Sequence, residues 1–207
     1  MNRLFWLQLA LLVAVVITLA FYRVSPNKVK EQNIIAELQL HQSPGSIRFF
    51  QVVSNSISFF SLGIPAVFLF TGLVKKKKLW VRQSLIILLS IALGGSISAI
   101  LKRTIKEPRP YEVDSRIAQL SVGGSNSFPS GHTVEATAAA IGFSAILFRT
   151  PLSIFLSVAW ALTIMFSRIV LGVHNITDIL GGVAIGCIGM LIIHHLFQQR
   201  PLPEENS

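Results

Sequence analysis

The sequence predicts an all-α, polytopic membrane protein, a helical bundle with about six transmembrane helices. Hydrophobic residues make up 52% of the 207 residues, charged residues make up 13%, and the mean hydropathy is +0.63. That composition is too apolar for a soluble domain of this size. Apolar stretches close to the length of about 17–25 residues that a membrane span needs recur along the chain. The sequence has no repeats and no low-complexity segments, so residues 1–207 are expected to form a single membrane-embedded domain.

The apolar stretches define six expected spans, at residues 4–22, 57–74, 84–101, 132–148, 152–167 and 176–197. The first follows Arg3 in the manner of a signal peptide. It is long for one, however, and no small-residue cleavage site follows it, so a retained anchor is expected. Residues 28–56, between the first two spans, mix charged residues with apolar pairs. This pattern predicts short amphipathic helices at the membrane interface, and a lid over a lipid site is the alternative.

Alternation of the spans brings polar positions to one side of the membrane. These positions are the end of the third span, the start of the fourth, the end of the fifth and the start of the sixth, near Lys102, His132, Arg168 and Asp178. Both termini and the loop 75–83 lie on the other side. Lys and Arg are more numerous on the polar side, but the positive-inside rule depends most on short loops, and 75–83 is densely basic. We therefore expect cytoplasmic termini, a plasma (or Gram-negative inner) membrane, and an active site facing the outer or periplasmic side.

The net charge is +9. Because the charged residues lie between apolar spans, this excess favours anionic lipid or an anionic substrate over nucleic acid as a partner. The single cysteine, Cys187, lies inside the sixth span. It therefore gives neither a disulfide framework nor a cysteine metal site.

Ionisable groups at membrane depth are costly, so they mark candidate functional residues. The first concentration is LKRTIKEPRPY, residues 101–111, in which Lys102 and Arg109 lie about two helical turns apart. Pro108 and Pro110 stiffen the backbone on either side of Arg109. Both cations are candidate phosphate ligands, and the alternative is a basic loop whose side chains reach the lipid headgroups.

The second concentration is PSGH, residues 129–132, which leads into the fourth span. A helix N-terminus offers unpaired N–H groups and a partial positive charge, both of which suit a phosphate. Ser130 can cap the helix or bind the anion, Gly131 allows the backbone to come close to it, and His132 can donate a proton to a leaving group. The alternative is an ordinary turn and cap, with His132 as an interfacial polar residue.

The third concentration is FSRIVLGVHNITDIL, residues 166–180. His174 and Asp178 are spaced i, i+4, which places them on one helical face. A carboxylate that accepts from one imidazole nitrogen fixes the tautomer and leaves the other nitrogen free as a nucleophile or base. Arg168 can reach the same anion. The alternative is a purely structural His–Asp pair with an arginine at the interface.

A metal site is the competing explanation for the two histidines and Asp178, with Glu135 as a further ligand. The cations Lys102, Arg109 and Arg168 would crowd a metal ion, and they already supply the charge stabilisation that it would give. We therefore expect no metal and no cofactor.

The expected reaction is hydrolysis of a phosphomonoester or pyrophosphate. His174 attacks phosphorus, and His132 protonates the departing oxygen. The cations and the amides near Ser130 and Gly131 hold the other oxygens. Water then cleaves the phosphohistidine.

Lys102-x6-Arg109-Pro110, Pro129-Ser130-Gly131-His132 and Ser167-Arg168-x5-His174-x3-Asp178 resemble the three-part signature of the type 2 phosphatidic acid phosphatase and vanadium haloperoxidase superfamily. No signature position departs from the pattern. The resemblance implies a metal-independent membrane phosphatase with six spans and an outward-facing site. It also implies that the second histidine of the signature, here His174, is the nucleophile and that the PSGH histidine, here His132, is the acid.

Several functions fit these residues. A lipid phosphatase could act on undecaprenyl pyrophosphate, phosphatidylglycerophosphate, phosphatidic acid or the phosphates of lipid A, and the sequence does not choose among them. A vanadate-dependent haloperoxidase would use the same anion site, but such an oxidant does not need lipid access. A non-enzymatic binder or transporter of anionic lipid would not need His132 or the His174–Asp178 pair. The motifs leave the oligomeric state open.

Overall fold

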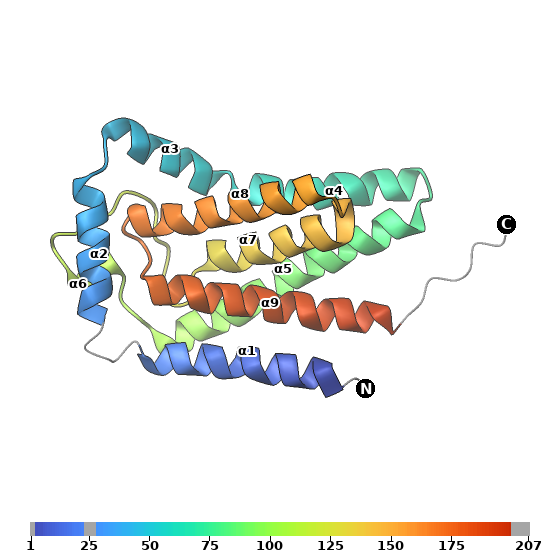
Figure 1. Ribbon diagram of the computed structural model, residues 1–207, viewed down its shortest axis with the longest axis horizontal. Coiled ribbons are helices and arrows are strands. Elements are labelled where there is room, and N and C mark those ends of the chain that lie inside the picture. The colour runs from blue at the N-terminus through green and yellow to red at the C-terminus, as the bar shows by residue number, and fades with distance from the viewer. Residues whose placement is uncertain (1–2, 23–27, 200–207) are drawn as a thin grey trace.

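The computed structural model describes residues 3–22 and 28–199. All regular structure in those ranges is helical (Figure 1). The elements are α1 (Arg3–Tyr22), α2 (Lys28–Leu40), α3 (Pro44–Asn55), α4 (Ile57–Val74), α5 (Lys78–Ile105), α6 (Pro110–Val113), α7 (Gly131–Ile141), the π-helical η1 (Gly142–Phe148), α8 (Pro151–Val170) and α9 (Ile176–Gln198). The predicted all-α class is confirmed.

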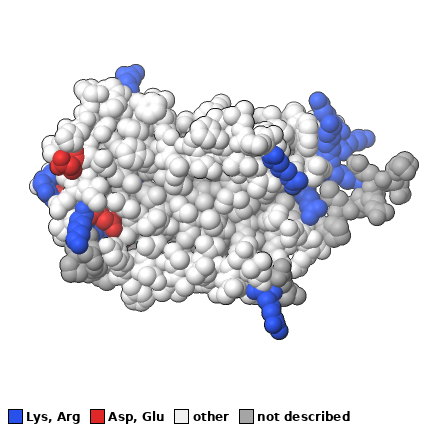
Figure 2. All heavy atoms as spheres, viewed as in Figure 1, with Lys and Arg blue, Asp and Glu red and all other residues white. Residues whose placement is uncertain are grey.

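Six helical segments in the described ranges are long and apolar enough to cross a membrane: Arg3–Tyr22, Pro44–Val74, Lys78–Val113, Gly131–Phe148, Pro151–Val170 and Ile176–Gln198. Figure 2 shows an uncharged band across the visible face, with Lys and Arg at both ends and Asp and Glu at one end only. The six predicted spans are therefore confirmed. Two segments are longer than predicted. The second also includes α3, ahead of the predicted 57–74. In the third, backbone hydrogen bonding continues past residues 84–101 to the polar ends of α5, which hydropathy does not detect.

The six spanning helices run side by side, and their ends gather in two places (Figure 1). At one end, called here the termini end, α1 begins, α9 finishes and a turn joins α4 to α5. At the other, the α2 end, α5 and α8 finish and α7 and α9 begin. This is the arrangement that alternation predicts, and it brings the polar stretches to the α2 end.

Residues 28–56, predicted to form short helices, form α2 and α3, and α3 leads directly into α4 within the second spanning segment. Helix α2 lies across the α2 end of the bundle, at a steep angle to the spans (Figure 1). Its buried face carries Ile35 and Ala36, which pack with Ile117. Gln39 on this helix accepts from the Ala118 amide (2.8 Å) and donates to the carbonyl oxygens of Ala118 and Val170 (both 3.0 Å). Hence α2 is packed onto the loops that connect the spans.

Helix α7 is central and contacts α4, α5, α8 and α9. Its close approach to α9 depends on glycine, since a Cβ at Gly182 would lie 2.7 Å from Thr133 Cβ and 2.8 Å from the Ser130 carbonyl oxygen. A Cβ at Gly186, one turn further along α9, would lie 2.7 Å from Thr137 Cβ. Such small residues spaced i, i+4 let membrane helices approach closely. The contact holds the start of α7 against the first turns of α9.

Candidate active site

The residues singled out from the three polar stretches meet at the α2 end. Each is placed by a helix terminus or by the loop next to it. Lys102 lies in the last turn of α5, Arg109 directly before α6, Arg168 near the end of α8, and Asp178 in the first turn of α9. Ser130 is the N-cap of α7, followed by Gly131 and His132, and His174 lies in the α8–α9 loop.

His174 is almost fully buried between an acceptor and a donor. Its Nδ1 lies 3.3 Å from Asp178 Oδ2, and its Nε2 lies 3.5 Å from Arg109 Nη1. A carboxylate oxygen only accepts and a guanidinium only donates. These two neighbours therefore select the tautomer with the proton on Nδ1, which leaves the Nε2 lone pair directed toward the cations.

Asp178 is held by more than His174. Its Oδ2 accepts from the Ser127 hydroxyl at 2.5 Å and from the Asn175 amide at 2.7 Å, and the residue is fully buried. Its backbone carbonyl accepts from the Ser130 amide at 3.0 Å. The carboxylate is thus fixed in place before it orients His174, and the same residue links the starts of α7 and α9.

Backbone carbonyls hold two of the cations. Arg109 is buried, and its guanidinium donates to the carbonyl oxygens of Ser125 (2.8 Å), Val173 (2.6 Å) and Asn126 (3.3 Å). Lys102 Nζ donates to the carbonyls of Asn126 (2.6 Å) and Ser127 (2.9 Å). Because these partners carry no formal charge, the positive charges stay available to a bound anion.

Arg168 is the third cation of the cluster. Its guanidinium donates to Ser54 Oγ on α3, to Ser121 Oγ (3.4 Å) and to the Val122 carbonyl (3.3 Å). Its Nε is buried and has no hydrogen-bond partner in the described ranges. A buried donor without a partner costs about 1–3 kcal/mol, so this atom is suited to a ligand oxygen.

The start of α7 is open to an anion. Ser130 Oγ accepts from the Thr133 amide (3.4 Å) and hydroxyl (2.9 Å), and a Cβ added at Gly131 would meet nothing within 4 Å. His132, next along the chain, interacts electrostatically with Arg168, His174, Arg109 and Lys102. No hydrogen bond to its ring occurs within the described residues, so both ring nitrogens are available for proton transfer.

Burial sets the protonation of His174. Desolvation is the largest effect and outweighs the hydrogen bond to Asp178, so the pKa of His174 is lowered to about 4. Neutral imidazole is therefore the dominant form at pH 7. In the described part of the chain, no three His, Cys, Asp or Glu side chains come close enough together to hold a metal ion.

Together these groups form a neutral, oriented imidazole next to three cations and a helix N-terminus. The family model of the PAP2 superfamily matches residues 83–202, which includes all of them. The chain belongs to the PAP2 superfamily. The resemblance seen in the sequence is thereby confirmed.

A PAP2 relative supports the enzyme class, and two solved structures share the fold. The chain is 28% identical over 165 residues to the lipid A 4'-phosphatase of Porphyromonas gingivalis, which covers 76% of this chain and 69% of that protein. Its fold matches the crystal structure of a transmembrane PAP2-type phosphatidylglycerolphosphate phosphatase from Bacillus subtilis, with TM-score 0.79, 22% identity, and 94% and 98% of the two chains covered. The crystal structure of Aquifex aeolicus LpxE also matches this fold, with TM-score 0.66 and 24% identity, over 79% of this chain and 93% of that chain. A phosphatase acting on lipid phosphate is thus supported.

The structure adds residues to the PAP2 site that the motifs did not reveal. Ser127 donates to Asp178, and Ser54 accepts from Arg168. Glu31 on α2 accepts from the Thr177 amide (3.2 Å) and hydroxyl (3.1 Å) in the first turn of α9. Glu107 is buried and paired with Lys28. A carboxylate is favoured near a helix N-terminus, but the helix that Glu31 contacts, α9, lies far from it in the sequence, so the sequence alone does not reveal this contact.

Proposed function

We propose that this PAP2 protein hydrolyses the phosphomonoester or terminal pyrophosphate of a membrane lipid through a phosphohistidine on His174. The observation that carries the proposal is the position of the His174 ring. Its Nδ1 lies 3.3 Å from Asp178 and its Nε2 lies 3.5 Å from Arg109, which leaves a nucleophilic lone pair directed at the cation cluster.

In the first step, the Nε2 lone pair of His174 attacks phosphorus and the bond from phosphorus to the lipid oxygen breaks. His132 gives its proton to that oxygen. Lys102, Arg109 and Arg168 stabilise the charge on the other phosphate oxygens, together with the α7 N-terminus at Ser130 and Gly131. Positioning and charge stabilisation supply most of the rate in phosphoryl transfer.

In the second step, His132 is neutral and takes a proton from water. The oxygen attacks phosphorus, the P–N bond breaks, and its electron pair returns to His174 Nε2. The proton stays on His174 Nδ1 throughout, where it donates to Asp178, and the Asp178 carboxylate stabilises the cationic ring of the intermediate. Inorganic phosphate leaves, and both histidines return to their starting states.

The proposed substrates are lipids, because the site lies at one end of six spans, next to the bilayer surface. The relatives named above as phosphatases of lipid A and of phosphatidylglycerolphosphate favour these two phosphate classes, and undecaprenyl pyrophosphate and phosphatidic acid remain in the panel to be tested. We place the site on the outer or periplasmic side. The described charged residues of the termini end are all basic, as is typical of a cytoplasmic face: Arg3, the four lysines 75–78, Arg82 and Arg149.

The decisive experiment measures phosphate release by purified protein in detergent with a chelator, across all four lipid phosphates. We expect turnover of at least one lipid, loss of turnover in His174→Ala, and unchanged turnover in His41→Ala. His41 is a matched exposed histidine whose partner among the described residues is Glu37. Substrate with a labelled phosphate should leave an alkali-stable, acid-labile label on the wild type and none on His174→Ala. No release from any of the lipids would refute the proposal.

Orientation is tested separately. In a Cys187→Ser background, a cysteine at the exposed Thr104 near the end of α5 should react with an impermeant reagent in sealed cells. A cysteine replacing exposed Lys76 at the termini end should react only after lysis. The opposite pattern would place the active site on the cytoplasmic side.

A further inference from the structure

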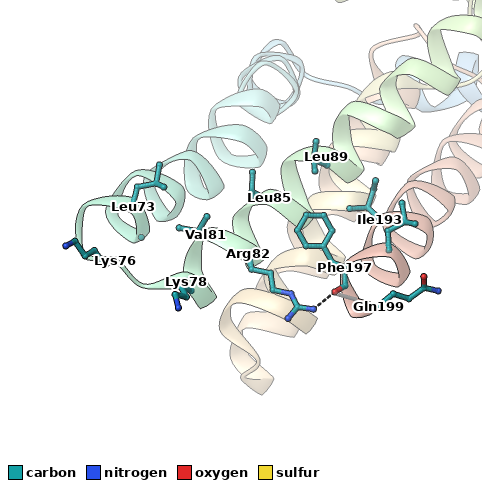
Figure 3. Close-up of a pocket in the computed structure, with 12 residues that line it drawn as sticks. Leu73, Lys76, Lys78, Val81, Arg82, Leu85, Leu89, Ile193, Phe197 and Gln199 are labelled. Atoms are coloured by element: carbon teal, nitrogen blue, oxygen red, sulfur yellow. Dashed lines mark hydrogen bonds between the residues drawn. The ribbon is translucent and has the colours of Figure 1, made fainter. Parts of the chain in front are cut away.

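The termini end of the bundle contains a groove about 30 Å from the active site. It lies between α4, α5 and α9 and has a volume of about 980 Å³ (Figure 3). Along α5, Arg82 in the groove and Lys102 in the active site are 20 residues apart, which is about 30 Å at 1.5 Å per residue. That is the thickness of a bilayer hydrocarbon core, so the two sites lie at opposite leaflets.

The groove has an apolar wall and a basic mouth. Leu85, Leu89 and Ile193 line its inner part, whereas Lys76, Lys78 and Arg82 lie at the end nearest the α4–α5 turn (Figure 3). Arg82 also donates to the Phe197 carbonyl, which fixes its guanidinium beside the last turns of α9. The apolar wall runs toward the membrane interior, and the charges gather where lipid headgroups lie.

The basic mouth has no acidic neighbours among the described residues. The described Asp and Glu all lie in α2, in the segment 107–114, or in α7 and α9 near the active site, and Figure 2 shows no acidic side chain at the termini end of the visible face. Lys77, by contrast, lies over the Trp80 ring at 4.6 Å and does not line the groove. Among the described residues, no carboxylate therefore offsets the charge of the groove cations, which favours a negatively charged occupant.

We propose that this groove binds one anionic glycerophospholipid from the leaflet at the termini end. The acyl chain lies along the leucine-lined wall, and the phosphate and headgroup bind Lys76, Lys78 and Arg82. Basic sites between transmembrane helices suit anionic headgroups because charge and apolar contact act together. This site is distinct from the catalytic one and does not depend on the proposed reaction.

Native mass spectrometry of the intact protein, titrated with phosphatidylglycerol or phosphatidylcholine of equal chain length, tests the proposal. We expect one phosphatidylglycerol to be retained and phosphatidylcholine to be retained far less. Lys76→Gln/Lys78→Gln should weaken phosphatidylglycerol binding about 30-fold, given the usual contribution of two lysines near a membrane surface. Lys75→Gln/Lys77→Gln removes the same charge beside the groove and should leave binding within about threefold of the wild type.

A second variant tests the apolar wall. Leu85→Trp fills the groove while keeping its cations, and it should also weaken phosphatidylglycerol binding. Phosphatase activity should stay normal in all these variants, which shows that they fold. The proposal is overturned if the two lysine pairs have equal effects, if both lipids bind alike, or if Leu85→Trp binds phosphatidylglycerol as the wild type does. It is also overturned if the protein is a dimer that Leu85→Trp dissociates, because a second copy of the chain would then occupy the groove.

Discussion

Asp178→Asn separates the charge of Asp178 from its hydrogen bonds. Oδ2 accepts from Ser127, His174 and Asn175, whereas Oδ1 is buried without a hydrogen-bond partner in the described ranges. A carboxamide can place its oxygen at the Oδ2 position and its NH₂ at the Oδ1 position. The variant therefore keeps all three hydrogen bonds and loses the negative charge, and its NH₂ replaces an oxygen that already lacked a described partner.

The distance to His174 sets the expected magnitude. When Nε2 attacks phosphorus, the ring becomes cationic 3.3 Å from Asp178 Oδ2. At an effective dielectric constant of about 20, a charge pair at that distance is worth about 5 kcal/mol. Each 1.36 kcal/mol is about tenfold in rate, so this energy corresponds to about 5 × 10³-fold in kcat. We expect kcat to fall by about 10³- to 10⁴-fold and KM to stay within a few-fold, because the cations still bind the phosphate.

The assay combines phosphate release with thermal unfolding of the detergent-purified protein. Asp178→Ala leaves three buried donors without an acceptor, at about 1–3 kcal/mol each, so it should lower both kcat and Tm. Asp178→Asn keeps those three bonds and leaves only its own NH₂ without a described partner, so it should lower kcat with a smaller loss of Tm. Glu37→Gln, an exposed carboxylate on α2, serves as the control. A kcat for Asp178→Asn within tenfold of the wild type would refute the electrostatic role of Asp178.

Three further predictions concern protonation, helix packing and the α2 contact. Burial lowers the pKa of His174 to about 4, so the acid limb of kcat/KM, corrected for substrate ionisation, should lie near pH 4. Because the unfolded chain binds this proton already near pH 6.5, the free energy of unfolding should fall as the pH drops from about 6.5 to 4. An acid limb near pH 6.5 would contradict this prediction. Gly186→Ala should lower the free energy of unfolding by about 1–3 kcal/mol, because its Cβ would lie 2.7 Å from Thr137 Cβ. Gly95→Ala, whose Cβ would meet nothing within 4 Å, should leave it unchanged. Thermal unfolding measures both variants, and equal losses would contradict the packing role of Gly186. Glu31→Gln should raise the rate of amide hydrogen exchange in α2 and at Thr177 by about five- to tenfold, because it weakens the Glu31–Thr177 hydrogen bonds. Glu37→Gln should leave these rates unchanged. Equal exchange rates in both variants would mean that the Glu31–Thr177 bonds do not hold α2 in place.

The membrane fold and the grouping of the polar stretches could be predicted from the sequence because charged residues are rare in apolar spans. Lys102, Arg168 and Asp178 lie at span ends that alternation assigns to one side, and the structure brings them together there. Their catalytic and phosphate-binding roles stay predictions. Span limits were less predictable, because α5 continues through polar residues whose backbone remains helical.

The supporting contacts could not be predicted, because they join residues far apart in the sequence. Ser127 is 51 residues from Asp178, and Glu31 is 146 residues from Thr177. Serine in a loop and glutamate on an interfacial helix are common, so neither residue type signals a role. Gly182 and Gly186 form a small-residue pair in an apolar span, but only the structure shows that their partner is α7.

The packing between α5 and α9 determines what a lipid in the groove can do to the active site. Both helices run from the groove to the catalytic cluster, with Lys102 near the end of α5 and Asp178 near the start of α9. Midway, a Cβ at Gly189 would lie 2.6 Å from the Ser90 carbonyl oxygen, so the two backbones are in close contact. Close-packed helices resist sliding. Lipid binding at the termini end should therefore raise Tm without moving Lys102 relative to Asp178. Phosphatidylglycerol should raise the Tm of the wild type more than that of Lys76→Gln/Lys78→Gln, while kcat stays equal in the two proteins. A parallel change in kcat would show instead that the α5–α9 contact couples lipid binding in the groove to the active site.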